Sequence, residues 1–329
     1  MEASNFPYDV TDVESQVSNE IFKATKPLPL VYVGPKRYIF PEMYKEWGPQ
    51  FYNMEIRPDD IFLVGFPRSG TTLCQEIIWL LNNNLDYKKA KSIPVGERVP
   101  LMDFSLVAFG GETFKNNNSP VLQKLEPYVH KLRTAPSPRF IKSHLPLSLL
   151  PPKLLDNNKV VYIARDPRDA AVSLYHLMEL KYLKQGTSFK EFWNNFIAGR
   201  CVVCPVQSHI REGWEKRNNP NLLFLSYNEL TRDFPSTLKR MATFFNKEYT
   251  NDQIDELCGH LSFDNFKNNE SVNRSSTYHK LGYVNNENPF IRKGKAGGWR
   301  EYFDDEMTKE ADRWISEHFT DIDLGIDPK

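Results

Sequence analysis

The sequence is poor in cysteine, in net charge and in long apolar runs, and each shortage excludes a class of protein. Its 329 residues include four cysteines, Cys74, Cys201, Cys204 and Cys258, which argues against a disulfide-built scaffold and for reduced, mostly buried thiols. Cys201 and Cys204 have the spacing of a redox or zinc pair, but no second pair accompanies them. The 42 basic and 42 acidic residues cancel, so neither nucleic acid nor an anionic membrane is expected as a partner.

Long apolar segments are also missing. No run approaches the roughly 20 residues of a membrane-spanning helix, and the first twenty residues are polar and acidic, unlike a signal peptide. We therefore expect a cytoplasmic protein without a membrane partner. The chain does contain 22 Phe, 15 Tyr and 6 Trp, which can fill a large core. We expect one α/β domain over residues 1–329, with an irregular lead-in at residues 1–30.

The stretch from Ile61 to Leu81 has the most informative pattern in the chain. It begins with four apolar residues, IFLV, long enough for one buried strand, and continues with a loop bounded by Gly65 and Gly70. From Thr71 onward the apolar residues recur at helical spacing. A loop between a strand and a helix points its backbone N–H groups at one spot near the positive end of the helix dipole. The pattern therefore predicts an anion site, with phosphate as the usual anion.

This loop lacks the lysine of a nucleoside triphosphatase. Its Gly65-x-x-x-x-Gly70 spacing fits the first part of a Walker A loop, but Thr71 stands where that motif has lysine. Without that clamp on the β- and γ-phosphates, a P-loop kinase is disfavoured, and we expect a different phosphate-like group. The alternative is a tight turn with incidental glycines. The hydroxyls and the cation, Arg68, that crowd the loop favour the anion site.

Three further apolar runs predict strands at 139–144, 159–164 and 222–227. His144, Arg165 and Tyr227 stand where these runs end. Because ligands in open α/β sheets bind beyond the carboxyl ends of the strands, we expect a central parallel sheet, flanked by helices, with these side chains at its ligand-binding edge. The other histidines, at positions 130, 176, 209, 260, 279 and 318, have no comparable context, and no metal-ligand cluster appears among them.

Two segments after the third run complete the predicted anion site. A helix is predicted over 170–183 with Asp169 as its N-cap, and Ser173 could reach the same anion as Arg165. Asp166 and Arg168 are expected to pair with each other at the surface. The basic, glycine-rich segment 290–300 suits a phosphate, with a solvated linker as the alternative. Residues 87–138 read as loops and short helices, either at the mouth of a site or as a surface connection.

Taken in order, these motifs resemble those of the cytosolic sulfotransferases over roughly residues 30 to 325. The PRSGTT segment at 67–72 resembles the loop with which that family holds the 5′-phosphosulfate of 3′-phosphoadenosine 5′-phosphosulfate (PAPS). The KSHLP segment at 142–146 resembles the one that carries the family's catalytic histidine, and residues 165–173 and 292–300 resemble its 3′-phosphate motifs. The 97–101 segment resembles one that lines the acceptor pocket. The insect branch, which includes retinol dehydratase, is the most similar.

The resemblance implies a P-loop-like fold and an enzyme that transfers a sulfuryl group from PAPS to a hydroxyl of a small, largely apolar phenol or alcohol. The product would be 3′,5′-adenosine bisphosphate (PAP), with no metal ion. It implies His144 as general base, assisted by Lys142 and Arg68. The residues implied in donor binding are Arg68, Ser69, Gly70, Thr71, Thr72, Arg165, Ser173, Tyr227, Phe263, Arg292, Lys293 and Gly294. Those implied in acceptor binding are Phe66, Pro67, Lys142 and His144.

The sequence departs from the family pattern at four places. Arg68 replaces the usual lysine, and a guanidinium is a poor proton donor. Leu73 replaces a tryptophan that often faces the adenine, and Gly298 replaces an aspartate. The family's dimer segment is missing after Phe303, so the oligomeric state stays open. Two alternatives to sulfation also stay open: dehydration of an allylic alcohol through a sulfated intermediate, and nucleotide binding without catalysis.

Overall fold

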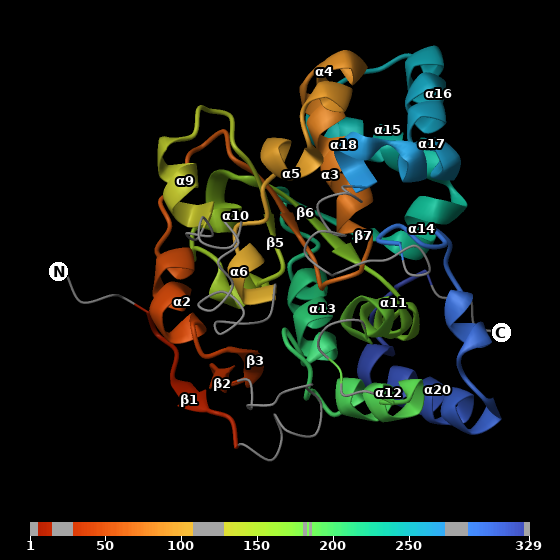
Figure 1. Cartoon of the computed structure of the whole chain (residues 1–329). Helices are drawn as coiled ribbons and strands as arrows, with labels where there is room; N and C mark the ends of the chain where they lie inside the picture. Colours follow the sequence, from red (N-terminus) through yellow and green to blue (C-terminus); the bar gives the residue numbers. More distant parts are fainter. Residues whose placement is uncertain are drawn as a thin grey trace.

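A parallel sheet lies at the centre of the computed structural model, which describes residues 6–14, 29–107, 128–179, 183, 186–273 and 289–325 (Figure 1). In this part of the chain the sheet has four strands in the order β5-β4-β6-β7. Their bounds are β4 Ile61–Val64, β5 Phe140–Ser143, β6 Lys159–Ala164 and β7 Leu222–Ser226. Because all three pairings are parallel, the carboxyl ends of the strands meet at one edge. The predicted α/β fold with a central parallel sheet is confirmed.

The sheet is buried on both faces, which explains why its strands are apolar runs rather than alternating patterns. Phe62, Val160 and Tyr162 belong to one core cluster, and Leu63 and Val161 belong to the other. Helices α11, α12, α13 and α20 contribute to the first cluster, whereas α3, α15 and α16 contribute to the second. Figure 1 shows these two groups of helices on either side of the strands.

The helices vary from one turn to four. Their bounds are α2 Tyr44–Tyr52, α3 Thr71–Asn82, α4 Tyr87–Ser92, α5 Val95–Arg98, α6 Phe104–Val107, α9 Tyr128–Thr134, α10 Leu154–Asn157, α11 Pro167–Glu179, α12 Phe189–Ile197, α13 Val206–Glu215, α14 Tyr227–Arg232, α15 Phe234–Phe244, α16 Asn251–His260, α17 Phe263–Asn268, α18 Glu270–Asn273 and α20 Asp305–Phe319, with single 3₁₀ turns η1 Leu147–Leu149 and η2 Gly298–Glu301. Among the described residues, no helix is long and apolar enough to cross a membrane.

A second, antiparallel sheet corrects the interpretation of residues 1–30 as an irregular lead-in. It consists of β1 Val10–Asp12, β2 Leu30–Val33 and β3 Tyr38–Pro41, in that order. Strand β1 has one apolar residue in three and is mostly exposed, so it carries no alternating pattern that could predict it. The pairing with β2, which is buried, makes it a strand.

Two predictions about the start of α11 are wrong in detail. The helix begins at Pro167, a residue suited to the first helical position, so Asp169 lies within the first turn and does not cap it. Asp166 and Arg168 do form an ion pair, with 2.8 Å between carboxylate and guanidinium, but both are buried. They are covered because Arg168 also pairs with Asp312 of α20 and stacks on the ring of Trp299.

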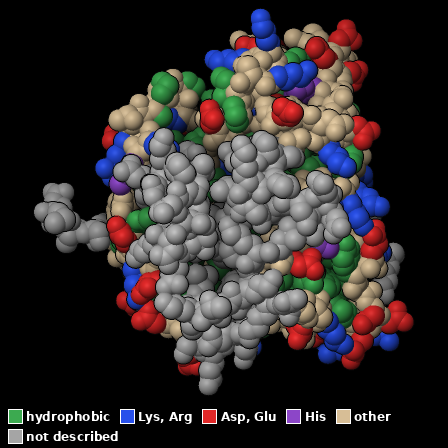
Figure 2. All heavy atoms as spheres, viewed as in Figure 1, with side chains coloured by type: hydrophobic (Ala, Val, Ile, Leu, Met, Phe, Trp, Pro, Cys, Tyr) green, Lys and Arg blue, Asp and Glu red, His purple; other side chains and the backbone are tan. Residues whose placement is uncertain are grey.

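The described surface mixes charges of both signs. On the face shown in Figure 2, acidic and basic side chains are interspersed rather than gathered by sign, as the balanced composition requires. Cys74, Cys201 and Cys204 are buried and Cys258 is partly exposed, and all four are free thiols, as expected. No group of side chains in the described ranges could hold a metal ion.

Candidate active site

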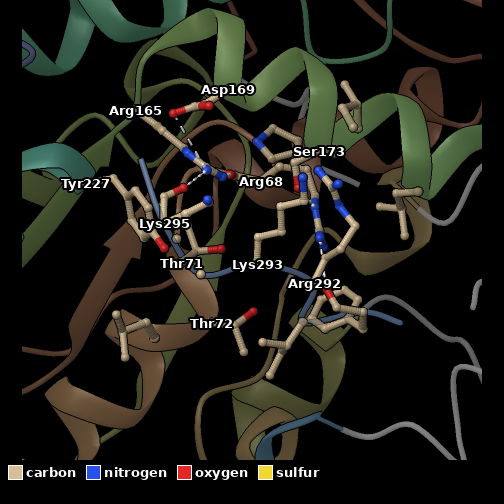
Figure 3. Close-up of a pocket in the computed structure, with 18 of the residues that line it drawn as sticks. Arg68, Thr71, Thr72, Arg165, Asp169, Ser173, Tyr227, Arg292, Lys293 and Lys295 are labelled. Atoms are coloured by element: carbon tan, nitrogen blue, oxygen red, sulfur yellow. Dashed lines mark hydrogen bonds and ion pairs between the residues drawn. The ribbon is translucent and has the colours of Figure 1, made fainter. Parts of the chain in front are cut away.

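A cavity of about 410 Å³ opens at the carboxyl edge of the central sheet. The structure brings most of the predicted site residues into its lining. These are Pro67, Arg68, Gly70, Thr71, Thr72, Lys142, His144, Arg165, Ser173, Tyr227, Phe263, Arg292, Lys293 and Gly294. They come from segments far apart in the sequence, and Figure 3 shows Arg68, Arg165, Arg292 and Lys293 gathered in one part of the pocket.

Phe66 and Ser69 are not among the residues that line the cavity, and their contacts with the acceptor and the donor stay predictions. The ring of Phe66 is fully buried and makes edge contacts with Phe196 and His209 in the core. Ser69 is also buried, and its N–H donates to the Phe66 carbonyl at 3.3 Å. Among the described residues the buried Ser69 hydroxyl has no hydrogen-bond partner, and a bound anion would satisfy this donor.

The loop after β4 depends on a glycine at position 70. Gly70 has φ +94°, and a Cβ there would lie 2.4 Å from the ring of Tyr227. Only glycine satisfies both the left-handed backbone and this close approach. Thr71 and Thr72 then begin α3 and line the cavity, so the positive end of the helix dipole faces it. The predicted anion site therefore has the expected local structure.

Arg68 connects this loop to two other walls of the cavity. Its Nε donates to the Ser173 hydroxyl of α11 at 3.0 Å, and its Nη2 donates to the carbonyl of Phe290 at 2.9 Å. The guanidinium also lies 4.6 Å from the centre of the Phe290 ring. The planar fork of arginine serves both polar partners at once, which the single ammonium of a lysine does less well.

Arg165 and Asp169 fix the basic segment 292–298 against the start of α11. Arg165 donates to the carbonyls of Arg68 and Lys295 at 3.1 and 3.2 Å, and its guanidinium stacks 4.5 Å from the Tyr227 ring (Figure 3). The Asp169 carboxylate accepts from the N–H groups of Gly297 and Trp299 at 2.7 and 2.9 Å. Among the described residues, the buried Nε of Arg165 has no hydrogen-bond partner. A bound anion would satisfy this donor, whose burial is otherwise costly.

The 292–295 segment contributes further cations to the cavity lining. Arg292 donates to the Tyr302 hydroxyl at 2.7 Å, and Lys293 pairs with Glu301. A Cβ at Gly294 would lie 2.3 Å from the ring of Phe263, so the glycine lets this ring lie flat against the segment. Burial, together with Arg292 and Lys293, lowers the pKa of His176 to about 4.

His144 is held as a neutral imidazole. Its Nδ1 lies 2.6 Å from the carbonyl oxygen of Gly65. A carbonyl can only accept, so Nδ1 carries the proton and Nε2 keeps its lone pair. Burial, and next the charge of Lys142, hold the pKa of His144 well below its usual 6.5. The ring is therefore in its basic form at neutral pH and can accept a proton.

Lys142 is oriented by a residue that sequence reasoning missed. Its ammonium donates to the side-chain oxygen of Gln75 at 3.2 Å, and the Gln75 amide donates to the Val99 carbonyl at 2.7 Å. Gln75 is buried and lies one turn after Thr71 on α3. A polar residue at that spacing from a predicted anion loop is the signal that could have identified it.

Apolar side chains form the other part of the cavity lining. Because one of them belongs to residues 97–101, that segment is better interpreted as part of the cavity wall than as a surface connection. They are Leu73, Leu101, Phe104, Val172, Leu174, Leu177, Val202, Val203, Phe234, Leu261, Phe266, Phe290 and Ile291. Val202 and Val203 lie between the buried Cys201 and Cys204, and the Cys204 N–H donates to the Cys201 carbonyl at 3.0 Å. The cysteine pair therefore shapes a turn of the wall. Of the 97–101 segment, Leu101 reaches the cavity, whereas Arg98 is buried against Glu76.

Comparison with known proteins decides the family. A model of the sulfotransferase domain matches residues 58–323. This chain belongs to the sulfotransferase family. The sulfotransferase is 30% identical over 308 residues to luciferin sulfotransferase from Photinus pyralis, with 91% of this chain and 82% of that protein covered. It also resembles retinol dehydratase bound to androsterone and the inactive cofactor PAP, with 38% identity, a TM-score of 0.89 and coverage of 98% and 99%. A retinol dehydratase complex with retinol and PAP gives 37% identity and the same TM-score.

Proposed function

We propose that this sulfotransferase transfers a sulfuryl group from PAPS to the hydroxyl of a small, largely apolar acceptor, with His144 as general base. The observation that carries the proposal is the composition of one cavity, which combines six cationic side chains, a neutral histidine and an apolar lining. The cations suit the phosphates and sulfate of the donor, and the apolar lining suits the acceptor. PAP is present in structures of retinol dehydratase, which the chain resembles.

PAPS would be held by the residues that line the cationic part of the cavity. The start of α3, with Thr71 and Thr72, suits the 5′-phosphosulfate, because helix N-termini stabilise anions. The unpartnered Nε of Arg165 suits the 3′-phosphate. Ser173, Arg292, Lys293 and Gly294 complete the phosphate contacts, and the rings of Tyr227 and Phe263 provide flat surfaces for an adenine.

In the reaction, Nε2 of His144 accepts the hydroxyl proton while the acceptor oxygen attacks sulfur and the bond from sulfur to the 5′-phosphate oxygen breaks. Lys142 and Arg68 stabilise the negative charge on the sulfuryl oxygens and on the departing phosphate. Arg68 does so without giving up a proton, because a guanidinium stays charged. The protein itself supplies these positive charges, so the proposed step needs no metal ion.

Nucleotide selectivity tests the donor assignment. PAP should raise the melting temperature of the protein well above the value reached with the same concentration of 5′-AMP. At equal concentration, the ligand with the lower Kd stabilises the fold more, and 5′-AMP lacks the 3′-phosphate that Arg165, Arg292 and Lys293 would bind. Differential scanning fluorimetry at matched concentrations measures the difference. Equal shifts with the two nucleotides would remove these three residues from the 3′-phosphate site.

The role of Arg68 can be separated into charge and geometry. Arg68→Lys should keep substantial activity, since it preserves the charge but loses one of the contacts to Ser173 and Phe290. Arg68→Ala should lose far more, because both the charge and the contacts disappear. Steady-state turnover with saturating PAPS gives the comparison. If Arg68→Ala turned over like the wild type, Arg68 would have no part in the mechanism.

Dehydration of an allylic alcohol is the second candidate, and the structural similarity to retinol dehydratase over 98% of the chain favours keeping it. The first half of that reaction would use the same residues, followed by loss of sulfate from the sulfated intermediate. The identity of the product separates the two functions: a stable sulfate ester in one case, an alkene and free sulfate in the other. A protein that binds the nucleotide without catalysis is disfavoured by the neutral His144 beside a charged Lys142.

A further inference from the structure

The backbone of His144 is held on both sides by side chains distant in the sequence. Its N–H donates to the Asp103 carboxylate, at 3.1 and 3.0 Å from the two oxygens. Its carbonyl oxygen lies 3.1 Å from Nε2 of His209. The ring is held separately, through Nδ1 and the Gly65 carbonyl. Three different segments, those before α6, in α13 and after β4, thus converge on one residue at the end of β5.

His209 is built to act as a donor toward this carbonyl. A carbonyl only accepts, so Nε2 of His209 carries the proton and Nδ1 accepts from the Tyr162 hydroxyl, 2.6 Å away. The same hydroxyl also donates to the backbone carbonyl of His209 at 2.7 Å, so its single proton is shared between that carbonyl and Nδ1. The ring is fully buried, and the Phe66 ring lies edge-on at 5.8 Å. Burial lowers the pKa of His209 to about 4, so it remains neutral at neutral pH.

Asp103 is the acceptor on the other side. It is fully buried, and both of its carboxylate oxygens contact the single N–H of His144. Burial raises the pKa of Asp103 to about 6, and the His144 N–H is the strongest influence that opposes this rise. Asp103 also has hydrogen bonds with the Ser143 hydroxyl and with its own backbone N–H. Burying a carboxylate costs desolvation, and the hydrogen bond to the His144 N–H and these two others offset that cost.

We propose that His209 and Asp103 are positioning residues that fix the backbone of His144 from its two sides and thereby aim Nε2 at the acceptor hydroxyl. The proposal rests on the proposed function, in which His144 is the general base. Proton transfer depends on near-contact geometry, and a displacement of about 1 Å can cost on the order of 100-fold in rate. Neither residue lines the cavity, so each acts through His144 rather than on the substrate.

The decisive variant is His209→Phe, which keeps an aromatic ring in the core but removes the donor to the His144 carbonyl. Tyr162 retains an acceptor, the backbone carbonyl of residue 209. We expect kcat to fall by roughly 10- to 100-fold while PAP affinity stays near the wild-type value. His209→Gln can still donate from a side-chain nitrogen and should recover most of the rate. Tyr38→Phe is the matched control, because it deletes a buried hydrogen bond to Glu212 of α13 that does not reach His144.

The pH profile of kcat separates positioning from general stability. The charged and titratable groups that face His144 are Lys142 of β5, Arg68 of the loop and His209 of α13, with Asp103 on its N–H. Burial keeps the His144 pKa low, so a loosened and better hydrated ring would titrate closer to 6.5. The acid limb of His209→Phe should therefore lie at higher pH than that of His209→Gln. Both variants lack the titratable ring of residue 209, so the difference reports on His144.

The outcomes are distinguishable from failure of the proposed function. Suppose that His144→Ala is inactive, that His209→Phe has the same kcat as Tyr38→Phe, and that the acid limbs of His209→Phe and His209→Gln coincide. The positioning role is then wrong, and the assignment of His144 as the base stands. If His144→Ala is fully active, the base assignment itself fails. Should His209→Phe not fold, the near-isosteric Asp103→Leu, which offers no acceptor to the His144 N–H, decides by the same criteria: lowered kcat with retained PAP binding supports positioning, and wild-type kcat overturns it.

Discussion

His144→Ala should lower kcat by a factor on the order of 100 to 10,000, the usual contribution of a positioned general base. Among the described residues that line the cavity, the nearby Lys142 and Arg68 are cations, and the Asp169 carboxylate is occupied by two backbone N–H groups, so none of these replaces the imidazole as the base. The same variant should bind PAP almost as well as the wild type, because other segments line the cationic part of the cavity. Turnover with PAPS and thermal shift with PAP measure the two properties on one preparation.

The pH dependence of the wild type belongs to the same prediction. The pKa of His144 lies well below 6.5, so its unprotonated form persists as the pH falls below 6.5. Activity should therefore hold through pH 6.5 and decline only at lower pH, where the imidazole gains a proton. A His144→Ala enzyme with normal turnover, or one that folds but no longer binds PAP, would contradict the assignment of this residue as the base.

Arg165→Ala should weaken PAP binding by about 100-fold, through the loss of charge-assisted hydrogen bonds worth roughly 1.5–3 kcal/mol each. The variant also releases the carbonyls of Arg68 and Lys295, which Arg165 connects across the cavity. The effect should appear mainly as a higher KM for PAPS, with a smaller change in kcat at saturation. Calorimetric titration with PAP gives the affinity directly.

Arg240→Ala provides the control for this prediction. Arg240 forms an ion pair with Glu229 and lies outside the cavity lining, so its removal deletes an arginine without touching the proposed donor site. It should bind PAP like the wild type. If Arg165→Ala and Arg240→Ala had similar affinities, the proposed 3′-phosphate site would not include Arg165.

Local patterns predicted the sheet and its loop because each depends on neighbours in the sequence. The run Ile61–Val64 is a strand, and the glycine at position 70 is where a left-handed turn and the Tyr227 ring require it. The helix predicted from the apolar spacing after Thr71 is α3. Strand β1 was missed because its pairing with β2, rather than its own composition, makes it a strand.

The contacts around the candidate catalytic pair could not be read from the sequence. Asp103 is separated from His144 by 41 residues, and His209 is separated from His144 by 65. No spacing rule connects such positions, so His209 looked like any other buried histidine. The inward orientation of Phe66 has the same origin, since only its packing against Phe196 and His209 distinguishes it from the cavity-facing Pro67.

The most direct test of the account is a product analysis by mass spectrometry. The wild type and His144→Ala would each be incubated with PAPS and a panel of phenols, apolar alcohols and retinol. The account predicts that the wild type releases PAP together with an equal amount of a sulfate ester, or of an alkene and free sulfate, and that His144→Ala releases little of either. Two results would contradict it. One is that no member of the panel gives PAP with either a sulfate ester or an alkene and free sulfate. The other is that the two enzymes form equal amounts of product.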